Sequence, residues 1–474
     1  MAESYDAIVV GAGPNGLAAA ITLAQAGRSV LVREANATVG GSCRSAELTL
    51  PGYIHDICST VQALAVASPF LRGLPLAEHG LELVYPRASY AHPLDDGHAG
   101  VAYRSLDETA ATLGRDGAAW KKLFGPLVRD WEKLAPALLG PLISPPRHPL
   151  ALANFGLKAL RSARSLAESW FEAEHAKGLF AGVAAHSITP LEWTATGAFG
   201  LVLGTSGHAG GWPVARAGSQ KVAEAMASLL RSLGGRIETG ARVENLDELP
   251  PAKLILCDVT PRQLVKLAGT RLPEGYKKRL QSFRYGPGVH KVDWALSEPI
   301  PWKAAGCRDA GTVHLGGTFD ELSRSERAPW EGRYADKPYV LLVQYPFDPS
   351  RAPAGKHTAW AYCHVPNGGD LDVTAQIESQ VERFAPGFKD TILARGVMTP
   401  EALERHNANL VGGDISGGAN MFWQLLARPA LRANPYRTPT KGLYLCSAST
   451  PPGAGVHGMC GHNAARLALK AELR

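Results

Sequence analysis

The chain has 474 residues, of which 45% are hydrophobic and 19% are charged. This composition fits a folded protein of two or three domains and argues against intrinsic disorder. The formal net charge of +6 is small for this length, and no dense Lys/Arg run with interleaved aromatic residues occurs. We therefore expect no nucleic-acid binding.

The sequence lacks the features of secreted, disulfide-bonded and zinc-binding proteins. Its seven cysteines are scattered without a C-x-x-C pair, which argues against a disulfide framework and a zinc site, so no metal ligand is expected. We find neither a signal peptide nor an apolar run of about 18 residues. These features predict a cytoplasmic protein that is at most peripheral to a membrane.

Residues 5–34 have the pattern of a dinucleotide-binding βαβ unit. A short apolar run leads into a glycine turn, an alanine-rich helical run follows, and a second apolar run ends on an acidic residue. The glycines allow a tight turn and close approach of a pyrophosphate, while the acid accepts hydrogen bonds from ribose hydroxyls. That carboxylate disfavours the 2′-phosphate of NADP, but this stretch alone does not distinguish FAD from NAD. The predicted cofactor-binding residues here are Gly11, Gly13, Pro14, Asn15, Gly16 and Glu34.

A second strand, glycine turn and helix follow near the end of the sequence, from residue 442 onward. The turn contains Gly453, Gly455, Val456 and His457. One pyrophosphate needs only one helix N-terminus, so a second one suits a ligand with another electron-rich group, such as N1 and O2 of a reduced flavin. This motif favours FAD over NAD as the cofactor.

Several segments between these motifs resemble one family. A Gly40–Gly41 pair lies just beyond Glu34, residues 51–56 and the helix after Gly218 carry further similarity, and a glycine-rich stretch spans residues 409–424. With both glycine turns, they are similar to the phytoene-desaturase-like branch of FAD-dependent oxidoreductases in the amine-oxidase superfamily. That branch includes carotenoid desaturases and isomerases and retinol saturase. The resemblance covers nearly the whole chain and points to a bacterial subgroup.

The resemblance implies cofactor contacts for the residues that match the family's motifs. These are Ala35, Gly40, Gly41, Ser42 and Arg44 near the acid, and Val243, whose backbone would contact the flavin adenine. The family usually has Arg directly after its glycine pair, whereas Ser42 and Cys43 precede Arg44 in this chain. Pro451 stands where a histidine is frequent in the wider family.

We therefore predict an α/β protein with a Rossmann-type FAD-binding domain and a discontinuous, sheet-plus-helix substrate-binding domain. The FAD-binding domain takes residues 1–85, 205–270 and 430–474, and the substrate-binding domain takes residues 86–204 and 271–429. Alternating and continuous apolar runs between residues 285 and 365 predict an antiparallel sheet in the second domain.

The leading functional hypothesis is an FAD-dependent, desaturase-like oxidoreductase. In it, flavin N5 accepts a hydride from a C–H bond of a small hydrophobic substrate of the isoprenoid, polyene or acyl class. The electron acceptor is left open between O2 and a quinone. Two alternatives are a redox-neutral, flavin-dependent double-bond isomerase and a non-catalytic carrier that holds FAD and a hydrophobic ligand.

His457 and Lys291 are the candidate catalytic residues. An imidazole titrates near neutral pH, so His457 is suited to hydrogen-bond the flavin or to move a proton; its alternative role is to cap the last helix. Related oxidases place a lysine near the flavin through a water, and Lys291 is the candidate for that role; its alternative is an exposed strand face. Phe422 and Trp423 are interpreted either as facing the flavin ring or as core.

Residues 150–164 combine apolar residues with the cations Lys158, Arg161 and Arg164. Such a segment can lie on an anionic membrane while its cations extend to the lipid head groups. The alternative interpretation is a surface helix with a solvated basic face.

Overall fold

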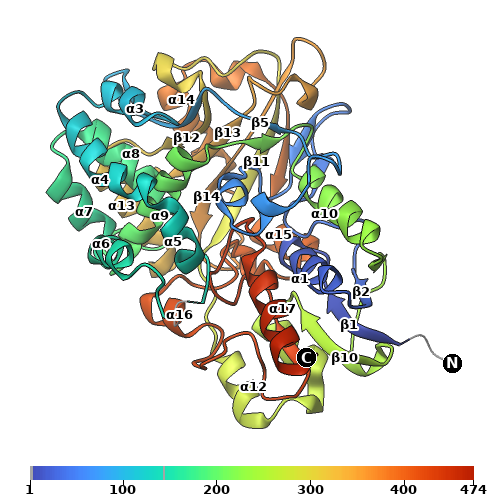
Figure 1. The fold of residues 1–474 in the computed structure, drawn as a ribbon. Helices are drawn as coiled ribbons and strands as arrows, with labels where there is room; N and C mark the ends of the chain where they lie inside the picture. Colours follow the sequence, from blue (N-terminus) through green and yellow to red (C-terminus); the bar gives the residue numbers. More distant parts are fainter. Residues whose placement is uncertain (1–3, 142–144, 474) are drawn as a thin grey trace.

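Two β-sheets organise the molecule, and helices pack around both of them (Figure 1). The computed structural model describes residues 4–141 and 145–473. It confirms the predicted α/β fold, with one parallel, Rossmann-type sheet and a second sheet that is largely antiparallel. The predicted residue boundaries between the two domains stay a prediction.

The first sheet has five strands, and every neighbouring pair in it is parallel. Its order is β16-β10-β1-β2-β9, so strands from the beginning, middle and end of the chain meet in one sheet. Parallel strands are buried on both faces, which explains their continuous apolar runs. The strands are β1 (Tyr5–Val10), β2 (Val30–Arg33), β9 (Arg236–Glu238), β10 (Ala252–Cys257) and β16 (Leu443–Leu445).

Helices cover both faces of this parallel sheet. On one face, α1 (Pro14–Gln25) packs between α10 (Gln220–Ser232) and α17 (Met459–Glu472), and their small and aliphatic residues form one buried cluster with the strands. On the other face, α11 (Pro261–Ala268) and α12 (Glu274–Gln281) share a second cluster with β10 and β16. The glycine turns therefore start from a rigid, buried layer.

The second sheet has seven strands in the order β15-β11-β14-β13-β12-β6-β7. Its pairs are antiparallel except for β6 and β12, which run parallel. The strands are β6 (Ala88–Pro93), β7 (Ala99–Tyr103), β11 (Gly288–Leu296), β12 (Ala310–Leu315), β13 (Val340–Gln344), β14 (His357–Val365) and β15 (Ile392–Met398).

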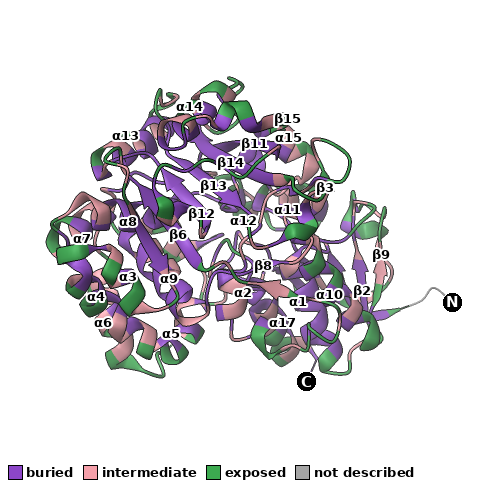
Figure 2. Ribbon diagram, turned by 90° about the horizontal axis from the view of Figure 1, so that it is seen from above, coloured by how far each residue is buried: buried purple, intermediate pink, exposed green. Residues whose placement is uncertain are grey.

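The two faces of the second sheet carry different side chains. Because successive strand residues point to opposite faces, Val292 and Trp294 lie on one face, while Lys291 and Asp293 lie on the other. The first face is largely aliphatic and packs against α14 (Thr374–Phe384). The second, which we call the inner face, packs on helices within residues 106–209. It also contacts Thr60, whose hydroxyl accepts from Trp360 Nε1. Figure 2 shows the central strands of both sheets as buried layers between helices, whereas the edge strands β9 and β15 are partly exposed.

The remaining helices and short strands complete the two halves of the molecule, each of which is built on one of the two sheets. The helices are α2 (Ala63–Ala67), α3 (Leu106–Thr112), α4 (Gly117–Arg129), α5 (Trp131–Leu138), α6 (Pro149–Ala159), α7 (Ala163–Trp170), α8 (Glu174–Ala184), α9 (Thr196–Ala209), α13 (Phe319–Arg327), α15 (Pro400–His406) and α16 (Phe422–Ala427). The short strands are β3 (Ser45–Glu47), β4 (Ile54–Asp56), β5 (Leu83–Val84) and β8 (Val214–Ala215).

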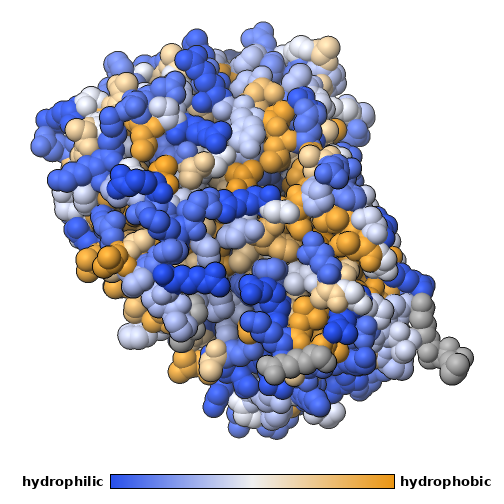
Figure 3. Space-filling model, viewed as in Figure 1, coloured by the Kyte–Doolittle hydropathy of each residue, from blue (hydrophilic) through white to orange (hydrophobic). Residues whose placement is uncertain are grey.

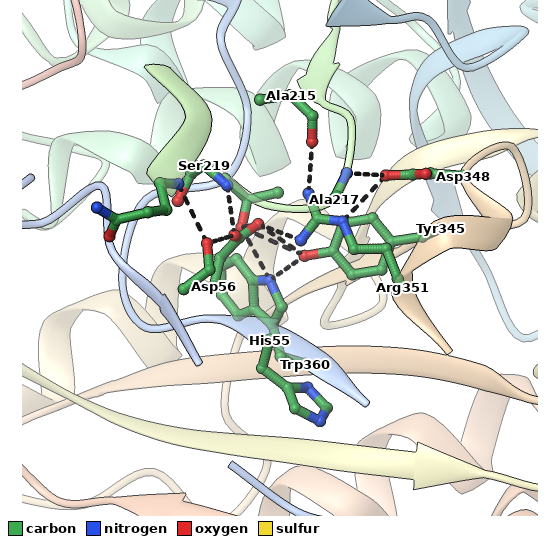
Figure 4. Close-up of polar contacts among 12 residues, drawn as sticks. His55, Asp56, Ala215, Ala217, Ser219, Tyr345, Asp348, Arg351 and Trp360 are labelled. Atoms are coloured by element: carbon green, nitrogen blue, oxygen red, sulfur yellow. Dashed lines mark hydrogen bonds and ion pairs between the residues drawn. The ribbon is translucent and has the colours of Figure 1, made fainter. Parts of the chain in front are cut away.

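A buried network around Asp56 joins the two halves (Figure 4). Its Oδ1 atom accepts the Ser219 backbone N–H at 2.7 Å, at the start of α10, and its Oδ2 atom accepts from Arg351 at 2.8 Å. Arg351 also donates to Asp348 at 3.1 Å. Burial raises the pKa of Asp56, but Arg351 and the hydrogen bonds outweigh it, so the pKa lies below its ordinary value. Since Arg351 comes from the second half, this ion pair fixes how the halves pack.

Within residues 4–141 and 145–473, no helix has the length and apolar character needed to cross a membrane. The same residues contain no group of three or more His, Cys, Asp or Glu side chains arranged to hold a metal ion. All seven cysteines are free, and six of them are buried.

Candidate functional site

The first glycine turn connects β1 to α1. Gly11 has a φ of +103°, a conformation that favours glycine, and an added Cβ at Gly16 would lie 2.1 Å from the Gly11 carbonyl oxygen. The helix therefore begins directly against the turn, as the spacing of the glycines predicts. Glu34 lies beside it at the end of β2, where its carboxylate accepts the Ala12 N–H at 2.8 Å. Its predicted contact with the ribose of a dinucleotide stays a prediction.

Asp258 is a second carboxyl at this turn, and the sequence motifs did not identify it. It follows β10, the strand beside β1, and its Oδ2 atom accepts the Gly16 N–H at 2.9 Å. The same atom lies 2.8 Å from the position of an added Cβ on Gly13. Burial raises the pKa of Asp258 to about 7, and Glu34 adds to this rise against the Gly16 hydrogen bond. The sequence signal that could have found Asp258 is its position, because it directly follows an apolar strand, as Glu34 does.

The C-terminal glycine turn meets the first one. An added Cβ on Gly461 would lie 1.8 Å from the Asn15 carbonyl oxygen, so α17 packs directly on the first turn of α1 (Figure 1). Gly453 and Gly455 have φ values of +112° and +127°. The Oδ1 atom of Asn15 is buried and has no hydrogen-bond partner among the described residues. The two glycine motifs, far apart in sequence, thus form one site.

His457 is buried in this second turn, and both of its ring nitrogens contact backbone groups. Nδ1 accepts the Met459 N–H at 3.0 Å, at the first residue of α17, and Nε2 lies 3.2 Å from the Gly453 carbonyl oxygen. Burial lowers the pKa of His457 to about 4, which keeps the ring neutral. This geometry supports the capping alternative, while the catalytic role stays a prediction.

The glycine pair crosses in front of the first turn. Gly41 has a φ of +53°, and an added Cβ there would lie 3.0 Å from the Gly13 Cα atom. Arg44 is buried and donates to the carbonyl oxygens of Gly41 at 3.1 Å and His406 at 2.7 Å. Its guanidinium therefore holds this loop in place, and the phosphate contact implied by the family stays a prediction.

Other predicted cofactor residues lie around the same turns. Ala241 donates its N–H to the Glu34 carbonyl oxygen at 2.8 Å, which brings the segment of Val243 to the end of β2. Ser42 accepts from Asn407 at 3.1 Å. Ala35 is half-buried at the end of β2, and Val456 is buried in the C-terminal turn. Each of these contacts with a cofactor stays a prediction.

Lys291 is buried on the inner face, so the alternative of an exposed strand face is wrong. Its Nζ atom lies 2.5 Å from both carboxylate oxygens of Asp293, and 5.0 Å from the centre of the Trp360 ring. Burial raises the pKa of Asp293 to about 6 despite this pairing. The Nδ1 atom of His55 lies 3.4 Å from Asp293, and burial lowers the pKa of His55 to about 3. Lys291 also acts electrostatically on Cys58, close to the loop of the glycine pair.

Comparisons with known proteins agree with this geometry. The model of the flavin-containing amine oxidoreductase family matches residues 15–264, more than half of the chain. The chain belongs to the flavin-containing amine oxidoreductase family. It is 25% identical to pyridine nucleotide-disulfide oxidoreductase domain-containing protein 2 of Rattus norvegicus, covering 98% of this chain and 93% of that protein. It is also 25% identical to a phytoene desaturase of Fusarium fujikuroi, covering 95% and 86%. A solved structure of a putrescine oxidase variant has a TM-score of 0.62 at 19% identity and covers 99% of both chains.

The cofactor of this flavin-containing amine oxidoreductase is FAD. Observations in the structure fit it: two helix N-termini converge, Glu34 stands at the ribose position, and the Asn15 Oδ1 atom at the turn has no partner among the described residues. Cys460 is buried, and its thiol donates to the Thr450 and Gly453 carbonyl oxygens at 3.5 and 3.4 Å.

The inner face of the flavoprotein is aromatic and aliphatic near Lys291. The Trp360 and Tyr362 rings stack with centres 5.8 Å apart. Leu341 and Val343 on the neighbouring β13, and Tyr345 just after that strand, belong to the same buried cluster. The charged groups in this region are paired, Lys291 with Asp293 and Arg351 with Asp56 and Asp348.

A separate surface cleft of about 650 Å³ opens beside α2. Its lining includes Arg72, Arg104, Glu108 and Glu132, so it is far more charged than the inner face. The helix α2 separates it from the C-terminal turn, because Leu64 packs beside Gly455 on one side and Val66 lines the cleft on the other.

Proposed function

We propose that this flavoprotein removes a hydride from a C–H bond of an apolar isoprenoid, polyene or acyl substrate, in the manner of a desaturase. The observation that carries the proposal is the apolar character of the inner face beside Lys291, where Trp360, Tyr362, Leu341 and Val343 belong to one cluster. Its charges are paired with each other, so it is suited to a substrate without a charged group. The name of the Fusarium relative, a phytoene desaturase, agrees with this substrate class.

FAD, when bound, supplies a flavin whose N5 atom accepts a hydride. Glu34 would hold the ribose hydroxyls of this cofactor, and the free N–H groups at the start of α1 would hold its diphosphate. The apolar inner face excludes water, which strengthens every electrostatic interaction inside the site. Asp293 holds Lys291 Nζ in position through both of its carboxylate oxygens.

Lys291 is the stronger of the two catalytic candidates. Its Nζ atom is buried beside the Trp360 ring and hydrogen-bonded to Asp293, where its charge or a water that it positions would act on the reacting atoms. His457, in contrast, has both nitrogens engaged with the backbone. Asp293 is then a positioning residue for Lys291.

Anaerobic mixing tests this proposal. The purified holoprotein is mixed without oxygen with carotenoid polyenes, isoprenoids and long-chain acyl compounds, and with primary amines as a comparison, while the visible flavin absorbance is followed. Bleaching by an apolar compound, with recovery on adding O2 or a quinone, is the expected result. Bleaching by amines alone would contradict the proposal.

The same measurement separates the alternatives. An isomerase would convert a double bond while consuming no acceptor, and a carrier would bind the ligand with a flavin that neither reduces nor reoxidises. Product analysis by mass therefore accompanies the spectra, because a desaturated product is two hydrogens lighter than its substrate whereas an isomerised product has the same mass.

A further inference from the structure

The most exposed large hydrophobic side chains of the described chain gather on two segments. Leu150, Leu157 and Leu160 are 87%, 77% and 56% exposed on α6 and at its end, and Trp423 and Leu431 are 76% and 69% exposed on α16 and just after it. Every other large hydrophobic residue in the described ranges is at most 48% exposed. The expectation that Trp423 faces the flavin or the core is therefore wrong. Such clustering is typical of a surface that is covered in use.

The two segments lie at one corner of the molecule. The helix α6 packs on α5 and α9, and Pro141, three residues after the end of α5, lines the same small cavity as Leu426 and Ala427 of α16. Asn420, just before α16, donates to the Ser187 carbonyl oxygen at 3.0 Å. Figure 1 shows α6 and α16 on the same side, and Figure 3 shows hydrophobic side chains at that edge. We call this surface the α6–α16 corner.

Cations surround the α6–α16 corner. Arg147 is exposed just before α6, and Arg432 follows α16 with its guanidinium 5.6 Å from the ring of Tyr276 on α12. On and after α12, Lys278, Arg279 and Arg284 are exposed. For the side chains of these five cations, the described part of the chain supplies no carboxylate in an ion pair. The corner therefore combines apolar side chains with unpaired positive charge.

We propose that the α6–α16 corner lies on an anionic lipid bilayer. Leu150 and Leu157 are seven residues apart and share one face of α6, and an exposed Trp with flanking Arg and Lys is the composition favoured at the boundary between head groups and acyl chains. The unpaired cations around the corner complement the negative head groups of such a bilayer. The proposal does not depend on the substrate of the flavin.

Vesicle flotation tests this inference with the holoprotein. Vesicles of phosphatidylcholine alone are compared with vesicles that also contain phosphatidylglycerol, at low and high salt. We expect the protein to float with the anionic vesicles and to bind the neutral ones at least about tenfold less, with binding that falls as salt rises. The double variant Leu157→Ser/Trp423→Ser should lose about tenfold in partitioning, and Arg147→Gln/Arg432→Gln should lose binding to anionic vesicles only.

The matched control is Leu371→Ser/Leu393→Ser, because both side chains are 48% exposed and lie away from the corner. It should float as the unmodified protein does. All variants change exposed residues, so unchanged thermal melts and flavin spectra check that each one is folded. Absence of flotation, equal effects of test and control variants, or a dimer that only the Leu157→Ser/Trp423→Ser variant dissociates would overturn the proposal, the last by assigning the corner to a second copy.

Discussion

The two sheets of this flavoprotein hold their polar groups in different ways. Beside the parallel sheet, glycine turns present backbone N–H groups, and the carboxyls of Glu34 and Asp258 accept from them at 2.8 and 2.9 Å. At the second sheet, buried charged side chains pair with each other, as in Lys291 with Asp293 and Arg351 with Asp56. We therefore expect changes in the backbone of the glycine turns to alter the affinity for FAD. Changes in the ion pairs should instead alter the packing of the two halves and the rate of flavin reduction.

Breaking the ion pair between the halves should have the largest effect. Arg351→Met leaves Asp56 buried without its cation, and we expect the free energy of unfolding to fall by about 3–5 kcal/mol, measured by urea unfolding. Arg333→Met is the control, since it removes only an exposed pair with Glu331, and it should change stability by less than about 1 kcal/mol. Equal losses for both variants would contradict the role of the buried pair.

Disturbing the contact between the two glycine turns should weaken FAD binding. Gly461→Ala places a Cβ against the Asn15 carbonyl oxygen and pushes α17 away from α1, at a cost of about 1–3 kcal/mol. We expect the Kd for FAD to rise about ten- to hundredfold, measured by titrating apoprotein. Gly156→Ala, in α6 with open space around it, should leave this Kd unchanged. An unaltered affinity for FAD in Gly461→Ala would mean that the second glycine turn does not contribute to FAD binding, which would contradict the prediction.

The carboxyl of Asp258 should make FAD affinity depend on pH. Its pKa is raised to about 7 in the free protein, so it is neutral below that pH and charged above it. A nearby diphosphate disfavours the charged form, so FAD binding requires proton uptake above pH 7, and affinity should fall by up to about tenfold per pH unit there. Asp258→Asn keeps an oxygen for the Gly16 N–H and should flatten this dependence in the same titration. A profile identical to that of the unmodified protein would contradict it.

A smaller effect on stability is expected at Ala217, at the junction of the two halves. Ala217 has a φ of +58°, and a side chain in this region of backbone conformation costs about 1 kcal/mol. Ala217→Gly should raise the free energy of unfolding by up to about 1 kcal/mol in urea. A loss of stability would mean that the added freedom of the unfolded chain outweighs the strain that is relieved.

The parallel sheet and its turns could be predicted from the sequence because their function rests on glycine. The spacing of Gly11, Gly13 and Gly16, and the C-terminal turn, identified positions where an added Cβ would lie 2.1–3.1 Å from a neighbouring atom. Such positions can be recognised in the sequence because they require glycine at fixed spacings. Asp258 could not be recognised in this way, since it reaches the turn only through the pairing of β10 with β1.

The inner face could not be predicted in the same way. Lys291 alternates with apolar residues, a pattern that fits an exposed strand face equally well, and only the packing of the two halves buries it beside Asp293. Arg351 stands in a loop some 295 positions from its partner Asp56, a distance that no local pattern spans. Trp423 was expected at the flavin or in the core for its size, yet it is 76% exposed.

The rate of anaerobic flavin reduction in Lys291→Met tests most directly whether the parallel sheet determines FAD binding while the second sheet determines reactivity. We predict that this variant binds FAD with a Kd close to that of the unmodified protein, and that an apolar substrate reduces its flavin at least about tenfold more slowly. Lys253→Met, which removes an exposed lysine of β10 paired with Asp6, should change neither quantity. Loss of FAD binding, or an unchanged rate of reduction, would contradict the account.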